Sequence, residues 1–324
     1  MKILIIRFSS IGDIVLTTPV IRCIKKQVSE VEIHYLTSYS FRDIIEHNPY
    51  IDKKYYLEND LNSIVKSLRK ENYDFILDLH GSRKSWRIKL LLGKKSRTFN
   101  KLNFEKWLYV NFKWNILPPV HIVDRYLEPV RWLGVRNDGE GLDYFLALKD
   151  EITIDQLPLT HIHGYIALVI GAKHYTKKLP IEKLLKLCSY LTYPIIVLGG
   201  SEDQPIGEQL TKSDSLKIVN GCGRYSLNQS ASFIKQSTVV ITHDTGLMHI
   251  AAAYNKKIIS LWGNTVPEFG MYPYVADLKS VKVGIRDLPC RPCSKIGFSR
   301  CPQGHFKCME LIDQKLVAEA VSKI

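Results

Sequence analysis

The chain has 324 residues, 45% of them hydrophobic and 24% charged, a composition typical of a globular protein with two hydrophobic cores. Its longest apolar runs, such as Ile3–Ile6 and Ile166–Ile170, are far shorter than the roughly 20 residues that a membrane-spanning helix requires. The formal net charge of +13 indicates anionic partners, which include nucleic acid, acidic lipid headgroups and phosphorylated substrates.

Short β-branched runs and amphipathic stretches alternate in the first half, which predicts strands and helices in turn. Strands are expected at Lys2–Arg7, Glu32–Leu36, Lys54–Leu57 and Phe75–Leu79, and helices at Pro19–Gln27, Phe41–Glu46 and Leu61–Lys70. The first run superficially resembles a signal peptide, but it breaks at Arg7 and no small-residue cleavage site follows. A buried strand explains it better, and a cytoplasmic protein is expected.

The same alternation continues in the second half. Strands are expected at Tyr165–Ile170, Ile195–Leu198, Lys217–Val219, Val239–Thr242 and Lys257–Leu261, and helices near Ile181–Leu191, Gln204–Thr211, Leu227–Lys235 and Gly246–Tyr254. This pattern predicts an α/β protein with two doubly wound parallel sheets. The aperiodic, charged stretch 146–163 predicts a linker, with domains at 1–155 and 156–324 and a last helix that can return to the first domain. Ligands bind at the carboxyl ends of such strands, so we expect an interdomain cleft lined by these loops.

The loop after the first strand ends in Gly12 and Asp13. Gly12 lets the backbone pass close to a ligand, and Ser9 and Ser10 offer hydroxyl groups. Asp13 has two interpretations: it can cap the following helix, or it can act as a general base on an acceptor hydroxyl. Its position at the end of a strand favours the second interpretation.

A second polar loop opens the helix expected after the strand at Val239–Thr242. A small-residue turn at Thr245-Gly246-Leu247 presents backbone N–H groups and the positive end of a helix dipole, which suits a diphosphate. Asp244 can accept hydrogen bonds from sugar hydroxyls, and His249 follows one turn later. The alternative is simple capping by Asp244 or Thr245, with a buried, locally bonded His249.

Several stretches, taken together and in order, resemble glycosyltransferase family 9, whose best-known members are the heptosyltransferases of lipopolysaccharide core assembly. The matching stretches are residues 5–25 (IIRFSSIGDIVLTTPVIRCIK), 73–85 (YDFILDLHGSRKS), 121–127 (HIVDRYL), 177–180 (KKLP), 198–203 (LGGSED), 242–253 (THDTGLMHIAAA) and 260–267 (SLWGNTVP). The resemblance implies the two-domain GT-B architecture, with the acceptor on the first domain and the nucleotide sugar on the second. It also implies an inverting reaction that needs no catalytic metal.

Site residues follow from the resemblance, position by position. Asp13 looks like the family's general base, and Lys177 like the cation that steadies the departing diphosphate. The donor motif would comprise Glu202, Asp244, Thr245, Gly246, Leu247 and His249, and the acceptor side Ser10, Gly12, Arg83 and Lys84. Lys177 could instead form a solvated pair with Lys178, Glu202 could merely lead the next helix, and Arg83 and Lys84 could lie in a solvated basic loop. The turn Gly171-Ala172-Lys173-His174 is a poor match to the hydroxyl-rich turn of the family, which leaves the donor less certain than the reaction type.

Basic and aromatic residues mix in the segment 83–107. The basic set comprises Arg83, Lys84, Arg87, Lys89, Lys94, Lys95, Arg97, Lys101 and Lys106, with Trp86, Phe99, Phe104 and Trp107 interleaved. Such a mixture suits an anionic glycolipid acceptor or peripheral contact with the inner membrane. It would also suit RNA, but no recognised RNA-binding motif is present.

Four cysteines gather near the C-terminus: Cys290, Cys293, Cys301 and Cys308. A CxxC pair with two further thiols could hold a structural zinc, although six residues separate the second pair instead of the usual two to four. The alternative is a set of reduced packing thiols. We expect no catalytic metal, since no Asp-x-Asp pair is present.

We therefore expect an enzyme that moves a heptose from ADP-heptose to a lipopolysaccharide inner-core acceptor. One alternative is a family member that uses another nucleotide sugar in capsule or surface-glycan synthesis. A remote alternative is a nucleic-acid-binding protein.

Overall fold

A computed structural model of the chain describes residues 1–275 and 280–323. Its internal contacts divide the chain into two compact units. The first unit comprises Met1–Lys101 and Val120–Phe145, and the second comprises Leu102–Pro119 and Leu146–Ile324. The division after Phe145 precedes the boundary expected after residue 155, and residues 102–119 group with the second unit although they were expected in the first domain.

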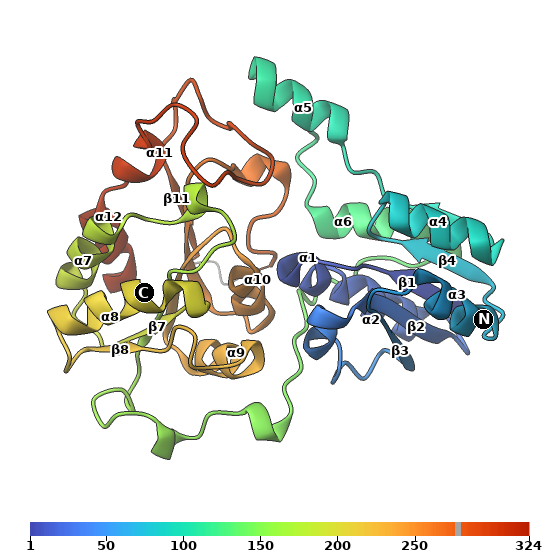
Figure 1. Ribbon diagram of the computed structural model, residues 1–324, viewed down its shortest axis with the longest axis horizontal. Coiled ribbons are helices and arrows are strands. Elements are labelled where there is room, and N and C mark those ends of the chain that lie inside the picture. Colours follow the sequence, from blue (N-terminus) through green and yellow to red (C-terminus); the bar gives the residue numbers. More distant parts are fainter. Residues whose placement is uncertain (276–279, 324) are drawn as a thin grey trace. The chain divides into compact units, whose positions relative to one another are not determined.

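The first unit is built on a five-stranded sheet in the order β3-β2-β1-β4-β5, with all neighbours parallel (Figure 1). Its strands are β1 (Lys2–Ile6), β2 (Glu32–Ser38), β3 (Lys53–Leu57), β4 (Phe75–Asp78) and β5 (Ser96–Thr98). Its α-helices are α1 (Ile11–Val15), α2 (Thr18–Gln27), α3 (Leu61–Arg69), α4 (Arg83–Leu92) and α6 (Ile122–Leu127). The expected helix at Phe41–Glu46 is a 3₁₀ helix over Tyr39–Ile44. Strand order reverses between β1 and β4, so the loops after these two strands lie at the switch point of the sheet.

The central strand β1 shows why this sequence makes a buried parallel strand. Residues Ile3–Ile6 are fully buried on both faces of the sheet. Leu4 and Ile6 join a core cluster that also contains Leu68 of α3 and Ile88 of α4. Truncating one such side chain to alanine typically costs about 2–5 kcal/mol, so β1 fixes the position of the loop that follows it.

The segment 120–145 returns to the first unit and is held there by a buried arginine. Arg22 of α2 donates to Asp138 at 2.8 Å and to the carbonyl of Gly141 at 2.8 Å, and it also pairs with Asp143. The Asp143 N–H donates to the hydroxyl of Thr18 at 2.9 Å. These contacts tie the end of the segment to α2.

The second unit contains a six-stranded parallel sheet in the order β11-β10-β9-β6-β7-β8 (Figure 1). Its strands are β6 (Ile166–Val169), β7 (Ile195–Leu198), β8 (Ile218–Asn220), β9 (Val239–His243), β10 (Lys257–Trp262) and β11 (Val281–Gly284). Its α-helices are α5 (Asn103–Phe112), α7 (Ile181–Tyr190), α8 (Gln204–Ser213), α9 (Leu227–Gln236), α10 (Gly246–Ala253), α11 (Lys307–Glu310) and α12 (Gln314–Ser322). The order reverses between β6 and β9, which makes the loops after these strands the switch point.

The last helix, α12, packs on α7 and β10 within the second unit. Its Val317 and Val321 share a core cluster with Leu184 and Leu187 of α7. The predicted fold class, an α/β protein with two doubly wound parallel sheets, is confirmed. Within the described residues, no helix has the length and apolar character needed to cross a bilayer.

Candidate functional site

Asp13 lies directly after the β1 strand, in the first turn of α1. Its Oδ2 accepts hydrogen bonds from the hydroxyl of Ser10 at 2.7 Å and from the Ser10 N–H at 3.2 Å, so the expected helix-capping role is present. Its Oδ1 lies 2.7 Å from a guanidinium nitrogen of Arg7. The carboxylate is partly exposed and Ser10 is exposed, while Gly12 is buried between them. The ion pair favours the ionised carboxylate, which is the form that can take a proton.

Arg7, the last expected residue of the first strand, was not foreseen as part of the site. Its guanidinium donates to the carbonyls of Ser9 at 2.7 Å and Leu79 at 2.6 Å, and to the hydroxyl of Tyr126 at 3.1 Å. Since Arg7 is buried and makes hydrogen bonds to three other residues, its guanidinium holds the Asp13 carboxylate in place. The position of the carboxylate is thereby set by β1, β4 and α6.

The loop after β4 lies at the same edge of the sheet and contributes His80. Its ring packs on Phe8 with centroids 4.9 Å apart, and its Nδ1 is buried without a partner among the described residues. Burial, together with the positive charges of Arg7 and Lys101, lowers the pKa of His80 to about 4. The imidazole is therefore neutral at pH 7. The sequence stretch LDLHGS contained this residue, but no argument singled it out.

Arg83 and Lys84 occupy the first turn of α4 and are exposed. The alternative of a solvated basic loop does not describe their backbone, because Ser82 caps the helix by accepting from the Ser85 N–H at 3.2 Å. The helix follows β4 by four residues, so both cations lie near the edge of the sheet that carries Asp13. They are in a position to contact an anionic ligand at this edge.

In the second unit, Lys177 and Asp244 form an ion pair at the switch point. The Lys177 ammonium lies 2.5 Å from Asp244 Oδ2 and donates to the Asp244 carbonyl at 3.2 Å. The hydroxyl of Thr265, in the loop after β10, donates to the same Oδ2 at 2.8 Å. The structure thus joins two residues that are 67 positions apart in the sequence. It also adds Thr265, which sequence reasoning missed.

The helix α10 begins immediately after Asp244. Thr245 is its N-cap in an extended conformation, and its side chain makes no capping hydrogen bond to the first turn. Gly246 and Leu247 open the helix and are partly exposed, whereas His249 is 2% exposed and lies in the interior. The N–H groups of the first turn and the adjacent Lys177 together offer positive charge to an anion.

Lys178 does not form a solvated pair with Lys177. Its ammonium lies 2.6 Å from Oδ1 of Asp203, a carboxylate that is 1% exposed and also accepts from the Gly200 N–H at 3.0 Å. The neighbouring Glu202 is exposed within the 3₁₀ turn Ser201–Asp203 that precedes α8. The two lysines are therefore directed to two different carboxylates, and the solvated-pair interpretation is wrong.

Two further polar residues at this edge were missed. His243, the last residue of β9, accepts the Leu179 N–H at its Nε2 with a distance of 2.9 Å, and burial lowers its pKa to about 3. This bond ties the segment that carries Lys177 to the sheet. Asn264, beside Thr265, is 1% exposed and neither atom of its amide has a partner among the described residues. Both residues lie in stretches that carried the family resemblance.

The C-terminal cysteines are free thiols that lie near one another. Burial, together with the neighbouring Cys293 and Cys301, raises the pKa of Cys308 to about 12. Cys290 Sγ lies 3.8 Å from His305 Nε2. In the part of the chain that the structure describes, no three ligand atoms of this group lie within 4.8 Å of one another, which is looser than a tetrahedral zinc requires. A structural zinc here stays a prediction.

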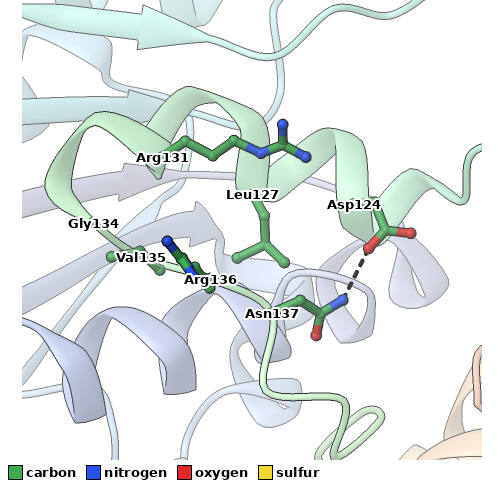
Figure 2. Close-up of a pocket in the computed structure, with 7 residues that line it drawn as sticks. All are labelled: Asp124, Leu127, Arg131, Gly134, Val135, Arg136 and Asn137. Atoms are coloured by element: carbon green, nitrogen blue, oxygen red, sulfur yellow. Dashed lines mark hydrogen bonds between the residues drawn. The ribbon is translucent and has the colours of Figure 1, made fainter.

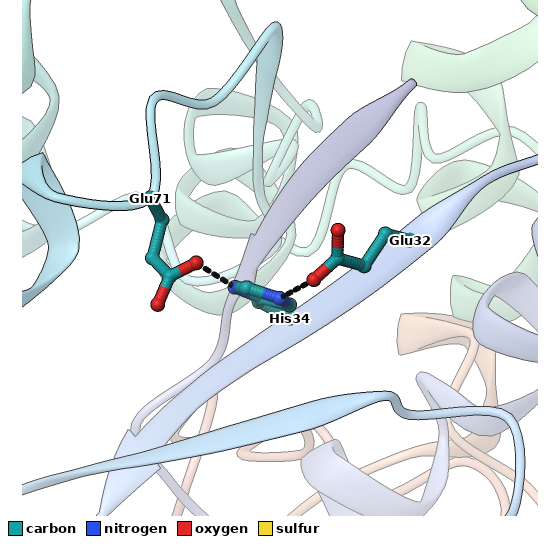
Figure 3. Close-up of side chains that lie close together, drawn as sticks. All are labelled: Glu32, His34 and Glu71. Atoms are coloured by element: carbon teal, nitrogen blue, oxygen red, sulfur yellow. Dashed lines mark hydrogen bonds and ion pairs between the residues drawn. The ribbon is translucent and has the colours of Figure 1, made fainter.

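A different group has the spacing of a metal site: Glu32, His34 and Glu71 (Figure 3). His34 Nε2 lies 2.7 Å from Glu32 Oε1, as Figure 3 shows, and its Nδ1 is 2.9 Å from the Tyr73 hydroxyl. Lys2 lies 3.1 Å from Glu71 and 3.2 Å from Glu32, and Lys53 also pairs with Glu71. Since two lysines already neutralise the two carboxylates, and since Glu32 begins β2 at the amino edge of the sheet, we interpret this cluster as structural.

A surface pocket of about 480 Å³ lies on the first unit (Figure 2). Its lining residues are Asp124, Leu127, Arg131, Gly134, Val135, Arg136 and Asn137. Asn137 donates to Asp124 at 2.8 Å across the pocket, and Arg131 pairs with Glu128 at 3.0 Å. None of the predicted site residues lines it, so it receives no functional assignment.

Comparison with known proteins identifies relatives of the whole chain. The family model of glycosyltransferase family 9 (heptosyltransferase) matches residues 61–299. Lipopolysaccharide heptosyltransferase 1 of Campylobacter coli is 28% identical over 295 residues, which cover 82% of this chain and 84% of the relative. A glycosyl transferase family 9 structure from Veillonella parvula superimposes with a TM-score of 0.80 at 19% identity, over 99% of this chain and 96% of the other. An E. coli heptosyltransferase WaaC structure with ADP-2-deoxy-2-fluoro heptose gives a TM-score of 0.71 at 18% identity, over 100% and 99% of the two chains.

Proposed function

Because the chain belongs to glycosyltransferase family 9 and is a glycosyltransferase, we propose that it transfers a heptose from ADP-heptose to an inner-core acceptor of lipopolysaccharide. The observation that carries this proposal is the Lys177–Asp244 pair beside the uncapped first turn of α10. A cation next to free helix amides is suited to a diphosphate leaving group. A relative with an ADP-heptose analogue bound and relatives named as lipopolysaccharide heptosyltransferases support the choice of donor and acceptor.

On the acceptor side, Asp13 acts as general base. The Ser10 hydroxyl occupies its Oδ2 at 2.7 Å, so an acceptor hydroxyl that takes the place of this group would lie within reach for proton transfer. As the acceptor oxygen attacks the anomeric carbon, its proton passes to the Asp13 carboxylate. Arg7 holds the other oxygen and keeps the carboxylate in position. Arg83 and Lys84 bind phosphate or carboxylate groups of the glycolipid.

On the donor side, the bond between the anomeric carbon and the β-phosphate oxygen breaks as the new glycosidic bond forms. The electron pair leaves with ADP, and Lys177 and the first-turn N–H groups of α10 stabilise the charge that develops on the diphosphate. Asp244 holds Lys177 until the donor arrives and then accepts hydrogen bonds from sugar hydroxyls. Attack from the face opposite the leaving group inverts the anomeric centre.

No catalytic metal is required in this mechanism, because the Lys177 ammonium and a helix N-terminus supply the positive charge. Transfer should therefore persist in the presence of EDTA. An activity that EDTA abolishes and Mg²⁺ or Mn²⁺ restores would contradict this part of the proposal. The same preparation, purified without chelators, would show by metal analysis whether the C-terminal thiols hold zinc.

A second candidate is transfer from another nucleotide sugar into capsule or another surface glycan. The turn before Lys177 favours it, since Lys173 and His174 stand where a hydroxyl-rich turn was expected. The nearby hydroxyl of Thr176 is already bonded to the backbone of Phe298, which donates to it at 2.8 Å. This turn therefore offers the donor a different set of contacts from the one the family resemblance suggested.

A donor comparison decides between the two candidates. Purified enzyme would be incubated with heptose-deficient lipopolysaccharide and, in parallel, ADP-heptose, UDP-sugars and GDP-sugars, with the released nucleotide measured. Of the donors compared, we expect only ADP-heptose to release its nucleotide, and to do so only when the acceptor is present. Turnover of a UDP- or GDP-sugar at a higher kcat/KM would establish the second candidate instead. Nucleotide release that does not depend on acceptor would contradict both.

The acceptor of the proposed reaction is a glycolipid of the inner membrane. We therefore place the enzyme in the cytoplasm, with peripheral contact at the cytoplasmic face of that membrane. The partner classes are then a nucleotide sugar and an anionic glycolipid, without nucleic acid.

A further inference from the structure

The helix α5 (Asn103–Phe112) differs from the other described α-helices of the second unit because it contains no buried residue. Leu102, before it, and Lys113, after it, both adopt left-handed backbone conformations, with φ of 52° and 62°. Lys113 closes the helix by donating its N–H to the Tyr109 carbonyl at 3.1 Å. The helix is therefore well defined at both ends although it contributes nothing to a hydrophobic core.

One face of α5 is attached to the second unit. The ring of Tyr109 packs edge to face on Phe269, with centroids 6.0 Å apart, and the Lys106 ammonium lies 6.0 Å from the same ring. The Lys113 ammonium donates to the carbonyl of Pro292 at 2.8 Å. Residues 106, 109 and 113 lie on one side of a helix with 3.6 residues per turn, so these contacts define its attached face.

The opposite face is a continuous row of aromatic rings. Phe104 and Trp107 lie 6.3 Å apart, Trp107 and Phe112 lie 5.3 Å apart, and Trp114, just beyond the helix, lies 5.8 Å from Phe112. Phe104 and Trp114 are each 65% exposed, Phe112 is 52% exposed and Trp107 is 48% exposed. Ile116, two residues further along the chain, is 56% exposed. Contiguous exposed apolar residues of this size mark an interaction surface.

We propose that this aromatic face, formed by Phe104, Trp107, Phe112, Trp114 and Ile116, binds an anionic phospholipid bilayer at its headgroup level. Trp and Phe on one face of a surface helix, with lysines on the other face, are the pattern of an interfacial membrane anchor. The stretch as a whole is positively charged, since its lysines Lys101, Lys106 and Lys113 outnumber its one acidic residue, Glu105. The choice of a membrane rests on the proposed function, since its acceptor is a membrane glycolipid.

Two other occupants fit the surface less well. RNA would need several cations on the aromatic face itself to contact phosphates, but Lys106 and Lys113 lie on the attached face. A second copy of the chain would bury the rings, but the net charge of +13 opposes self-association and favours an anionic surface. The charge of the chain therefore favours the bilayer.

The test is sedimentation of the full-length protein with unilamellar vesicles that contain no acceptor. One set of vesicles is pure phosphatidylcholine and the other contains about 30 mol% phosphatidylglycerol. The main variant combines Phe104→Ser, Trp107→Ser, Phe112→Ser and Trp114→Ser. We expect the wild type to bind anionic vesicles more tightly than neutral ones, and the variant to bind them at least about tenfold more weakly.

Two matched variants serve as controls. The first replaces exposed apolar side chains of the second unit that lie outside the aromatic face, and combines Leu148→Ser, Leu159→Ser and Leu216→Ser. These side chains are 79–89% exposed, and their loss should leave vesicle binding unchanged. Trp107→Phe with Trp114→Phe keeps the aromatic face and should retain most of the binding. Stabilisation of each variant by ADP in a thermal melt shows that it is folded.

The proposal would be overturned if the wild type remained in the supernatant with anionic vesicles, or if the serine variant bound them as well as the wild type does. It would also be overturned if the wild type were a dimer and the serine variant a monomer, with equal vesicle binding. If ADP did not raise the melting temperature of the wild type, this result would count against the proposed donor. It would not affect the membrane proposal, because vesicle binding is measured without substrate.

Discussion

The two switch points of this protein carry the same kind of ion pair with the charges exchanged. In the first unit the cation, Arg7, is held in place by its other hydrogen bonds, and the carboxylate of Asp13 is the more exposed partner. The Arg7 side chain is 9% exposed and the Asp13 side chain 22%. In the second unit the carboxylate of Asp244 is held by Thr265, and the ammonium of Lys177 is slightly the more exposed, at 16% against 13%. In each pair one member fixes the other.

This difference indicates which chemical group each edge is suited to contact. A carboxylate held over a buried guanidinium can accept a proton and stays in place while it does so. An ammonium held by a carboxylate near a helix N-terminus can move to an anion that arrives there. We therefore propose proton transfer for the first unit and diphosphate binding for the second. The following predictions are ordered by the size of the expected effect.

Replacing Asp13 by Asn should reduce kcat by at least about 10²-fold, because the variant cannot take the proton of the acceptor hydroxyl. The donor KM should remain close to that of the wild type. Steady-state kinetics with varied donor and acceptor measure both values. Asp60→Asn is the matched control, since Asp60 caps α3 by accepting from the Asn62 N–H and has no part in the site. If Asp13→Asn kept full turnover, Asp13 would be a helix cap only.

Replacing Lys178 by Ala should destabilise the second unit by about 3 kcal/mol, because the buried carboxylate of Asp203 would lose its cation. Donor affinity of the folded variant should change little. Urea denaturation monitored by circular dichroism gives the first value and a nucleotide titration the second. Lys186→Ala, at an exposed position of α7, is the control. A stable Lys178→Ala variant that fails to bind nucleotide would reverse the roles assigned to the two lysines.

Lowering the pH should destabilise the protein partly through His243. Burial depresses its folded-state pKa to about 3, whereas the unfolded chain binds the proton near pH 6.5. The stability that depends on neutral His243 is therefore fully present above about pH 6.5 and decreases as the pH falls from there toward 3. At pH 5 the loss in free energy of unfolding is about 2 kcal/mol. In a His243→Gln variant, the decrease in Tm between pH 7.5 and pH 5 should be smaller than in the wild type. An equal decrease would show that His243 is not buried in its neutral form.

Reversing the charges of Arg83 and Lys84 with Glu substitutions should raise the acceptor KM about tenfold, since each cation is exposed and its attraction to phosphate is screened. The donor KM should not change. Kinetics with heptose-deficient lipopolysaccharide measure the effect, and Lys66→Glu on the exposed side of α3 provides a control. An unchanged acceptor KM would remove these two residues from the acceptor site.

Hydrophobic periodicity was enough to predict the strands and the helices that cover them, because burial on both faces leaves continuous apolar runs such as Ile3–Ile6 and Ile195–Leu198. It gave no signal for α5, which contains no buried residue, or for the short strands β5 and β11. The helix α4 was not predicted either, and its basic first turn fits a solvated loop equally well. Its cap depends on Ser82 and Ser85, two residues that a loop would also accommodate.

Strand order also predicted which loops lie at the switch points, but not the partners within them. Arg7 reads as the end of a strand, and its role depends on Leu79 and Tyr126, which are distant in the sequence. Likewise, Lys177 and Asp244 were each expected at the donor site, while their ion pair and the contribution of Thr265 follow from the adjacency of β6, β9 and β10. Such pairings come from tertiary packing, which a single sequence does not display.

The division of labour between the two pairs is tested most directly by titrating ADP into Asp13→Asn and Lys177→Ala side by side and measuring Kd by calorimetry. We expect Asp13→Asn to bind ADP as the wild type does, and Lys177→Ala to bind it about tenfold more weakly because the diphosphate loses a charge-assisted contact. The contrary result would be weaker ADP binding in Asp13→Asn with unchanged binding in Lys177→Ala.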